Sequence, residues 1–196
     1  MSGVRLKFNA NPHKNLNPSY SSADCLSRAT VYKARKQMVS VDMDGTIADI
    51  SRRRILALES GPDKSHEFYN ALLDGSRYHM DEPIIASRDF LHAYVAQTGG
   101  EIVYLSGRRQ GTEHNSEEWL RAHNFPSGRI LHRALGQRSL NFKLNWLRQL
   151  MKEGAWIDAH FGDRIEDDGG AAKAAGIRFV YIENNIWPIF PSYDLQ

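Results

Sequence analysis

The segment Val39–Thr46 constrains the fold of this chain more than any other, because a short apolar run ends there in two acids, a glycine and a hydroxyl. Its valines are β-branched and favour a buried strand over residues 38–42. Gly45 permits a backbone turn that other residues resist. We therefore expect Asp42 and Asp44 at the C-terminal end of a strand, the edge at which open α/β sheets bind their ligands.

Two carboxylates at this spacing have a definite chemistry. One can act as a nucleophile toward phosphorus and form an aspartyl-phosphate. The other can give a proton to a leaving group and then take one from water. Carboxylates also bind Mg²⁺ through oxygen, and the N–H groups of a turn can hold phosphoryl oxygens. Since Asp, Gly and Thr are also common in ordinary turns, the segment alone leaves a purely structural interpretation open.

Composition narrows the class of protein. With 196 residues, 41% of them hydrophobic and 24% charged, the chain is long enough for one globular domain with a real core. A net charge of +2 gives no strong polyanion signal. The single cysteine, Cys25, excludes an intrachain disulfide and a multi-cysteine zinc site. We find nothing like a signal peptide or a membrane span, and expect a cytoplasmic protein that binds no membrane.

The rest of the chain alternates short apolar runs with helical patterns. We expect further strands at residues 102–105, 130–131, 156–161 and 177–182, with helices between them, and therefore a five-stranded, doubly wound parallel α/β sheet. A helix is expected to begin at Asp81-Glu82-Pro83, with proline in its first turn. Residues 24–37 are expected to form a short helix.

The predicted domain organisation has three parts. Residues 1–37 are rich in Asn, Pro and Ser and are expected to be a polar N-terminal arm. Residues 38–196 are expected to form one domain. Within it, residues 49–82 read as a small insertion directly after the acidic turn, where it can cover the site as a lid.

Polar side chains follow the ends of three predicted strands. These are Asp42 and Asp44, then Ser106 and Arg108, and then Asp163 with Asp167 or Asp168; Lys143 adds a cation from an intervening helix. Because the C-terminal ends of parallel strands meet at one edge of a sheet, these groups can converge. Together they would supply a nucleophile, a proton carrier, a Mg²⁺ site and a cation for phosphate charge.

In these motifs the chain resembles the haloacid dehalogenase superfamily over roughly residues 38–183. Asp42-Met43-Asp44-Gly45-Thr46 is similar to its first motif, Ser106-Gly107-Arg108 to its second, Lys143 to its third, and Gly162-Asp163 through Asp168 to its fourth. The resemblance implies that Asp42 is the nucleophile and that Asp44 is the proton carrier. An acid at position 44 favours a phosphatase or phosphotransferase over a dehalogenase or a transport ATPase.

The same resemblance implies the ligands of the site. Mg²⁺ would be held by Asp42, the main-chain carbonyl of Asp44, Asp163 and Asp168, with Asp167 as the alternative to Asp168. The phosphoryl group would be bound by Thr46, Ser106, Gly107 and Lys143.

The second half of the chain is similar to the phosphatase module of polynucleotide kinase–phosphatase, which removes 3′-phosphates from nucleic-acid ends. The likeness lies in Ser106-Gly107-Arg108, Trp119-Leu120, Arg133, Arg138 and Phe142-Lys143. Arg108, Arg133 and Arg138 are the predicted substrate-binding residues, because arginine pairs with phosphate in a bidentate manner. No kinase P-loop is present. A phosphatase of small molecules or nucleotides and a non-catalytic binding module on the same fold are the alternatives.

Overall fold

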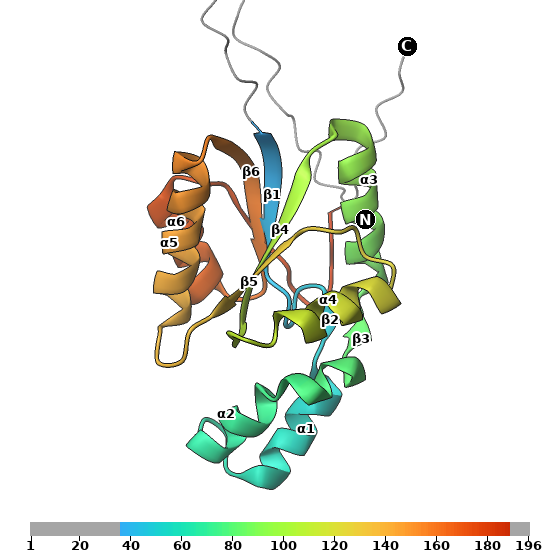
Figure 1. Cartoon of the computed structure of the whole chain (residues 1–196), viewed down its shortest axis with the longest axis vertical. Helices are drawn as coiled ribbons and strands as arrows, with labels where there is room; N and C mark the ends of the chain where they lie inside the picture. The colour runs from blue at the N-terminus through green and yellow to red at the C-terminus, as the bar shows by residue number, and fades with distance from the viewer. Residues whose placement is uncertain (1–35, 189–196) are drawn as a thin grey trace, which may run out of the picture. The chain divides into compact units, whose positions relative to one another are not determined.

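The computed structural model describes residues 36–188, which belong to one of the chain's two units, Arg35–Gln196. Its centre is a five-stranded sheet in the order β5-β4-β1-β6-β7 (Figure 1), and every neighbouring pair is parallel. The strands are β1 (Lys36–Val41), β4 (Glu101–Arg109), β5 (Arg129–Arg133), β6 (Ala155–Gly162) and β7 (Phe179–Tyr181). This confirms the predicted doubly wound sheet.

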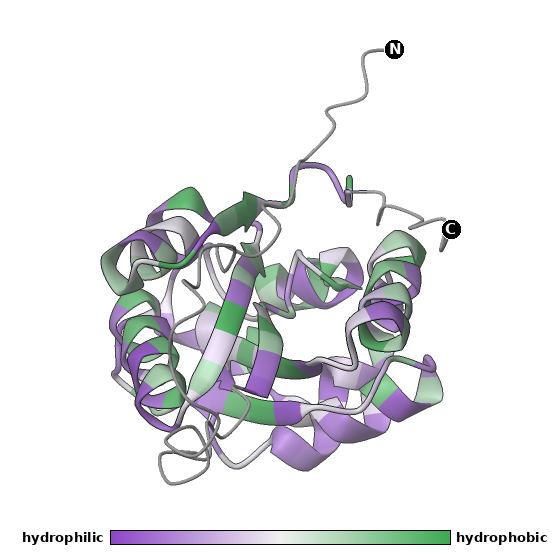
Figure 2. Ribbon diagram, turned by 90° about the horizontal axis from the view of Figure 1, so that it is seen from above, coloured by the Kyte–Doolittle hydropathy of each residue, from purple (hydrophilic) through white to green (hydrophobic). Residues whose placement is uncertain are grey.

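Helices cover both faces of this sheet. They are α3 (Ile85–Thr98) and α4 (Glu113–Ala122) on one face, and α5 (Ser139–Lys152) and α6 (Gly170–Ala175) on the other (Figure 1). In Figure 2 the helices on the two sides of the sheet show both hydrophobic and hydrophilic residues, as expected of helices that bury only one side. Among residues 36–188, no helix combines the length and the apolar character that a bilayer crossing requires.

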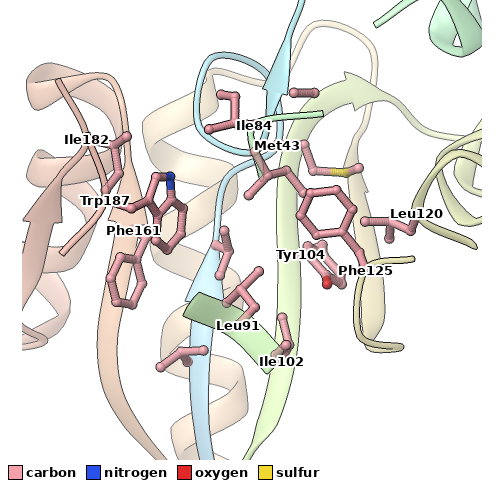
Figure 3. Packing of buried hydrophobic residues seen from close by; sticks show 14 of the residues in the cluster. Met43, Ile84, Leu91, Ile102, Tyr104, Leu120, Phe125, Phe161, Ile182 and Trp187 are labelled. Carbon is pink, nitrogen blue, oxygen red and sulfur yellow. The ribbon is translucent and has the colours of Figure 1, made fainter. Parts of the chain in front are cut away.

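Each face of the sheet has its own hydrophobic core. Val39 and Val41 point to the α3 and α4 side, where Phe161 and Trp187 stack with their ring centroids 5.0 Å apart (Figure 3). Met38 and Phe142 belong to the core under α5 and α6. The alternation along β1 therefore places Ser40 and Asp42 on the α5 side, together with Met38.

The insertion after the acidic turn is a small helical body on a two-stranded stem. β2 (Ala48–Asp49) pairs antiparallel with β3 (Glu82–Pro83), and between them lie α1 (Ser51–Ser60), α2 (His66–Leu72) and the 3₁₀ helix η1 (Gly75–Met80). Ala57, Phe68 and Leu72 form its own minor core. In Figure 1, α1 and α2 lie beyond the sheet edge at which β1 ends.

Two local predictions were wrong. Asp81-Glu82-Pro83 does not begin a helix: Glu82 and Pro83 form β3, and α3 begins at Ile85. Glu82 and Pro83 pair with β2 instead of forming the first turn of a helix. Residues 36–37, expected at the end of a helix, are instead the first residues of β1 and pair with Ala155 and Trp156. The rest of the predicted helix, like most of the predicted arm at 1–37, lies outside the described residues.

Candidate active site

Three carboxylates gather where β1 and β6 end. Asp42 follows β1, Asp163 follows β6, and Asp168 lies in the single π-helical turn η2 (Ile165–Gly169). One oxygen from each lies within 4.8 Å of the others. Asp167 is not part of this group; its carboxylate lies 3.9 Å from the guanidinium of Arg164. Of the two alternatives that we considered, the structure therefore brings Asp168 into the cluster.

Lys143 lies in the same buried cluster. Its ammonium is 2.9 Å from Asp42 Oδ1 and forms an ion pair with Asp168 Oδ1. Only 2% of the Lys143 side chain is exposed. The first turns of α5 thus deliver a cation directly to the carboxylate at the end of β1.

Three acids share one lysine in this cluster, and their pKa values are shifted in different directions. Burial raises the pKa of Asp42 to about 8, and the Asp168 and Asp163 carboxylates act in the same direction, against the Lys143 ammonium. Burial also raises the pKa of Asp163. In contrast, Lys143 and His160 outweigh burial and hold the pKa of Asp168 at about 2. The cluster therefore carries more acid than its lysine can neutralise.

The residues present fit a hard divalent cation. Asp163 Oδ1 is buried and accepts no hydrogen bond from the described part of the protein, although buried polar atoms are normally satisfied. Asp42 Oδ1 faces only the lysine. Oxygen donors with excess negative charge are the ligands that Mg²⁺ prefers. In this arrangement Asp163 offers a free oxygen and Asp42 Oδ1 has only the lysine beside it, whereas both oxygens of Asp168 already accept hydrogen bonds from Lys143, His160 and the Arg164 N–H.

Two glycines are required by the close approach of these acids. A Cβ on Gly45 would lie 2.3 Å from Asp163 Oδ2, and one on Gly162 would lie 2.3 Å from Asp168 Cγ. Gly45 also has a φ of +81°, a conformation that favours glycine. The backbone of the acidic turn and the carboxylate after β6 can therefore approach each other only without a side chain at position 45.

We expect Gly45→Ala to weaken binding of Mg²⁺ or Mn²⁺ by about 10- to 100-fold, the range typical of disturbed ligand support. The new methyl group must displace the Asp163 carboxylate, which is the movable end of a side chain. Because Asp163 is a proposed metal ligand, the displacement should reduce the affinity for the metal. Titration calorimetry with Mn²⁺ measures it. Gly111→Ala is the control, because Gly111 has a φ of +92° with nothing within 4 Å of its added Cβ. Equal affinities of the two variants for Mn²⁺ would show that a side chain at position 45 does not disturb Asp163.

Asp44 faces a different set of partners from Asp42. Its Oδ1 accepts hydrogen bonds from Arg53 Nη2 and Arg108 Nε, each at 2.8 Å. Burial alone would raise the pKa of Asp44, but the two guanidinium groups outweigh it and hold the pKa well below its usual range. In this conformation Asp44 is a fixed carboxylate.

Both arginines are held in turn by Asp81. Arg53 donates to its two oxygens at 2.8 and 2.9 Å, and Arg108 donates to Oδ2 at 2.7 Å. The ring of Tyr78 lies 4.1 Å from the Arg108 guanidinium carbon and 4.8 Å from that of Arg53. This buried charge cluster of Asp44, Arg53, Asp81 and Arg108 joins the insertion to the acidic turn and to the end of β4.

Sequence reasoning missed this cluster. In the sequence Arg53 is only the second of three consecutive arginines, and Asp81 was predicted to begin a helix, yet Arg53 is 0% exposed and Asp81 is 1% exposed. The charges of consecutive arginines say nothing about which of them is buried. The periodicity of the helix is the one signal that could have distinguished Arg53 from Arg52 and Arg54. Arg53 lies on the same face of α1 as Ala57, the other buried residue of this helix.

The remaining predicted site residues lie in different environments. Arg108 is fully buried, and its guanidinium is engaged by protein groups. Arg133 is half-buried and donates to the Gly107 and Gln137 carbonyls, and Arg138 is exposed at the start of α5. Ser106 is buried, and its hydroxyl accepts from the Arg108 N–H. The buried Thr46 hydroxyl has no partner in the described residues.

His132, at the end of β5, makes stability depend on pH. Burial lowers its pKa to about 4, because the charged imidazolium is disfavoured beside Arg108. The unfolded state, with a histidine pKa of about 6.5, then binds more protons between about pH 4 and 6.5. We expect the unfolding free energy to fall by on the order of 2 to 3 kcal/mol as pH drops through this window. Urea titrations of the protein and of His132→Gln isolate the effect, and parallel pH profiles would contradict it.

The order and direction of the strands give the chain a haloacid dehalogenase-like α/β fold. The chain matches the model of the family described as "PITM 1-3, LNS2 domain" over residues 75–182, more than half of its length, and it belongs to this family. The matched range contains Ser106, Lys143, Asp163 and Asp168, whereas Asp42 and Asp44 precede it. No curated protein matches the chain.

Solved structures share the fold. A chain of the Pnkp1/Rnl/Hen1 complex is 16% identical with a TM-score of 0.59, and the match covers 74% of this chain but only 45% of that one. A class C acid phosphatase from Bacillus anthracis with tungstate bound is 19% identical with a TM-score of 0.55, covering 81% and 70%. A hydrolase from Streptococcus pneumoniae TIGR4 is 16% identical with a TM-score of 0.51, covering 74% and 91%.

Proposed function

We propose that this protein is a phosphomonoesterase that acts through an aspartyl-phosphate on Asp42. The observation that carries the proposal is the convergence of Asp42, Asp163 and Asp168 within 4.8 Å, with the Lys143 ammonium 2.9 Å from Asp42. Asp42, the Asp44 main-chain carbonyl and Asp163 would hold Mg²⁺, with Asp168 completing the acidic group. Bound Mg²⁺ would neutralise the carboxylates and the phosphoryl oxygens, so that the two anions can approach.

The chain's own residues then perform two displacements. A carboxylate oxygen of Asp42 forms a bond to phosphorus while the bond from phosphorus to the ester oxygen breaks, and the alcohol leaves with a proton. Water then attacks the phosphorus of the aspartyl-phosphate, which releases inorganic phosphate and restores the carboxylate. Lys143 stabilises negative charge on the phosphoryl oxygens in both steps. Thr46, Ser106 and Gly107 are the proposed neutral contacts of the same group.

Asp44 is the proposed proton carrier, and its surroundings favour one of the two steps. Arg53 and Arg108 hold it as a carboxylate, which suits it to take a proton from the attacking water. Donation of a proton to the leaving group requires that Asp44 first gain one against two guanidinium groups. We therefore expect substrates with good leaving groups to react faster in the first step.

A nucleic-acid 3′-end is the proposed substrate. The second-half motifs support it, and so does the exposed Arg164, whose guanidinium interacts with the carboxylates of Asp163 and Asp42. Since Arg108 is buried, it acts on Asp44 rather than on the substrate, and Arg133 and Arg138 remain the proposed phosphate contacts. A protein of this composition, with one cysteine, would work in the cytoplasm.

A small-molecule or nucleotide phosphatase is the second candidate, and the buried charge cluster favours it. Burial of Arg53 and Arg108 removes two cations from the surface that a polymer backbone would contact. A non-catalytic binding module is the third candidate, because the fixed Asp44 carboxylate limits acid catalysis.

One panel separates the three candidates. Phosphate release with Mg²⁺ is measured for 3′-phosphorylated oligonucleotides, mononucleotides and p-nitrophenyl phosphate over a series of salt concentrations. An end-processing enzyme should prefer oligonucleotides and lose that preference as salt rises. Equal rates without a salt effect would indicate a small-molecule phosphatase. Binding without any phosphate release would indicate a binding module and would overturn the proposal.

A further inference from the structure

Two buried polar side chains, Ser40 and His160, lie beneath the acidic cluster, are linked to it by hydrogen bonds through Asp168, and take no part in the steps above. Ser40 Oγ lies 2.7 Å from His160 Nδ1, and His160 Nε2 lies 3.0 Å from Asp168 Oδ1. Ser40, His160 and Asp168 are all 0% exposed. Because β1 and β6 pair Ser40 directly with His160, the sheet register itself aligns the first two groups.

The hydrogen-bonding capacities of these groups set the direction of the chain. A carboxylate only accepts hydrogen bonds, so His160 Nε2 carries the proton that is donated to Asp168. In the neutral imidazole Nδ1 is then an acceptor, and the Ser40 hydroxyl donates to it. One tautomer therefore satisfies every group from Ser40 to Asp168.

Asp168 connects His160 to Lys143. Its Oδ1 accepts from both His160 and Lys143, and its Oδ2 accepts from the Arg164 N–H at 3.2 Å. Lys143 in turn reaches Asp42. Three protein partners thus hold the Asp168 carboxylate in place, and this carboxylate in turn pairs with the Lys143 ammonium.

We propose that Ser40 and His160 are positioning residues, which act through Asp168 to hold the Lys143 ammonium against the Asp42 carboxylate. They sit in the apolar core between the sheet and α5, where a polar pair is costly unless fully hydrogen-bonded. The ring centroid of Phe179, which packs against this core, lies 6.4 Å from that of His160. Neither Ser40 nor His160 touches the substrate, and their role rests on the proposed phosphatase function.

The test compares His160→Leu, which removes both hydrogen bonds, with His160→Gln, whose amide can donate to Asp168 and accept from Ser40. We expect His160→Leu to lower kcat for p-nitrophenyl phosphate by about 10- to 100-fold with little change in KM. His160→Gln should recover part of that loss, and the exposed His114→Leu should have no effect. Wild-type kcat in a folded His160→Leu would overturn the inference.

A second variant covers the case in which His160→Leu does not fold. Ser40→Ala should lower kcat in the same direction and to a smaller extent, and its effect should not add to that of His160→Gln, because both act on one chain of hydrogen bonds. Additive effects, or no effect of Ser40→Ala, would contradict the inference.

Imidazole ¹⁵N NMR tests the inference without turnover, and so separates its failure from that of the proposed function. We expect His160 as the Nε2–H tautomer, with a Nδ1 resonance that moves in Ser40→Ala. The Nδ1–H tautomer, or spectra identical in the two proteins, would overturn the inference even if the enzyme is active. Absence of phosphate release by the unmodified protein would overturn the proposed function alone.

Discussion

Asp42→Asn is expected to lower phosphate release with Mg²⁺ by about 10⁴-fold or more, as removal of a covalent nucleophile does in other enzymes. An amide oxygen of similar shape cannot form the acyl phosphate, and it also loses the charge that draws a cation to Asp163. Steady-state release of phosphate from p-nitrophenyl phosphate measures the effect. Asp167→Asn is the matched control, because Asp167 lies close in sequence to Asp168 but outside the cluster.

The same variant should be at least as stable as the unmodified protein when no metal is present. The folded-state pKa of Asp42, about 8, lies above the unfolded value, so the folded state binds more protons between about pH 4 and 8. Stability is therefore lost as pH rises through that window, and a neutral asparagine escapes the loss. Urea unfolding of both proteins in the presence of a chelator measures this difference in stability.

For the activity prediction, a folded Asp42→Asn with unchanged turnover would reject the covalent mechanism.

Arg53→Met is expected to lower the unfolding free energy by about 3 to 5 kcal/mol, since removing one partner of a buried ion pair leaves uncompensated charge. Asp81 would lose two of its hydrogen bonds and Asp44 one. Met has a similar length, so the change isolates charge from packing. Activity should fall as well, because the insertion would no longer hold the Asp44 carboxylate through this arginine.

Arg54→Met is the matched control for this prediction. Arg54 adjoins Arg53 and pairs with Asp63, but both side chains are more than 40% exposed. Exposed pairs of this kind contribute little, so we expect a change within about 0.5 kcal/mol. Chemical denaturation of both variants gives the comparison. Similar losses in the two proteins would mean that the buried charge cluster is not what fixes the insertion.

The prediction from sequence was strongest where local pattern and topology agree. β-Branched residues at 39 and 41, followed by acids and a glycine, locate the strand and its turn. The alternation of elements then brings Asp42, Asp163 and Asp168 to one edge by geometry alone. Lys143 joins them because it lies on the first turns of the helix that follows β5.

The sequence could not show the contacts that depend on burial and on side-chain direction. Arg108 was predicted to bind phosphate, because a sequence shows the charge of a side chain but not its exposure. The role of His160 could not be predicted, since its partners Ser40 and Asp168 become apparent only from the register of β1 with β6 and from the turn η2. Asp81 was read as a helix start because the pairing of β2 with β3 is non-local.

The most direct measurement is the capture of the acyl phosphate itself. The enzyme is mixed with substrate and Mg²⁺, quenched in acid during turnover, and reduced with borohydride, which converts an aspartyl-phosphate to homoserine. Peptide mass spectrometry should then find homoserine at position 42 and nowhere else. Reduction at another aspartate, or an unmodified Asp42 peptide from an enzyme that is releasing phosphate, would contradict the account.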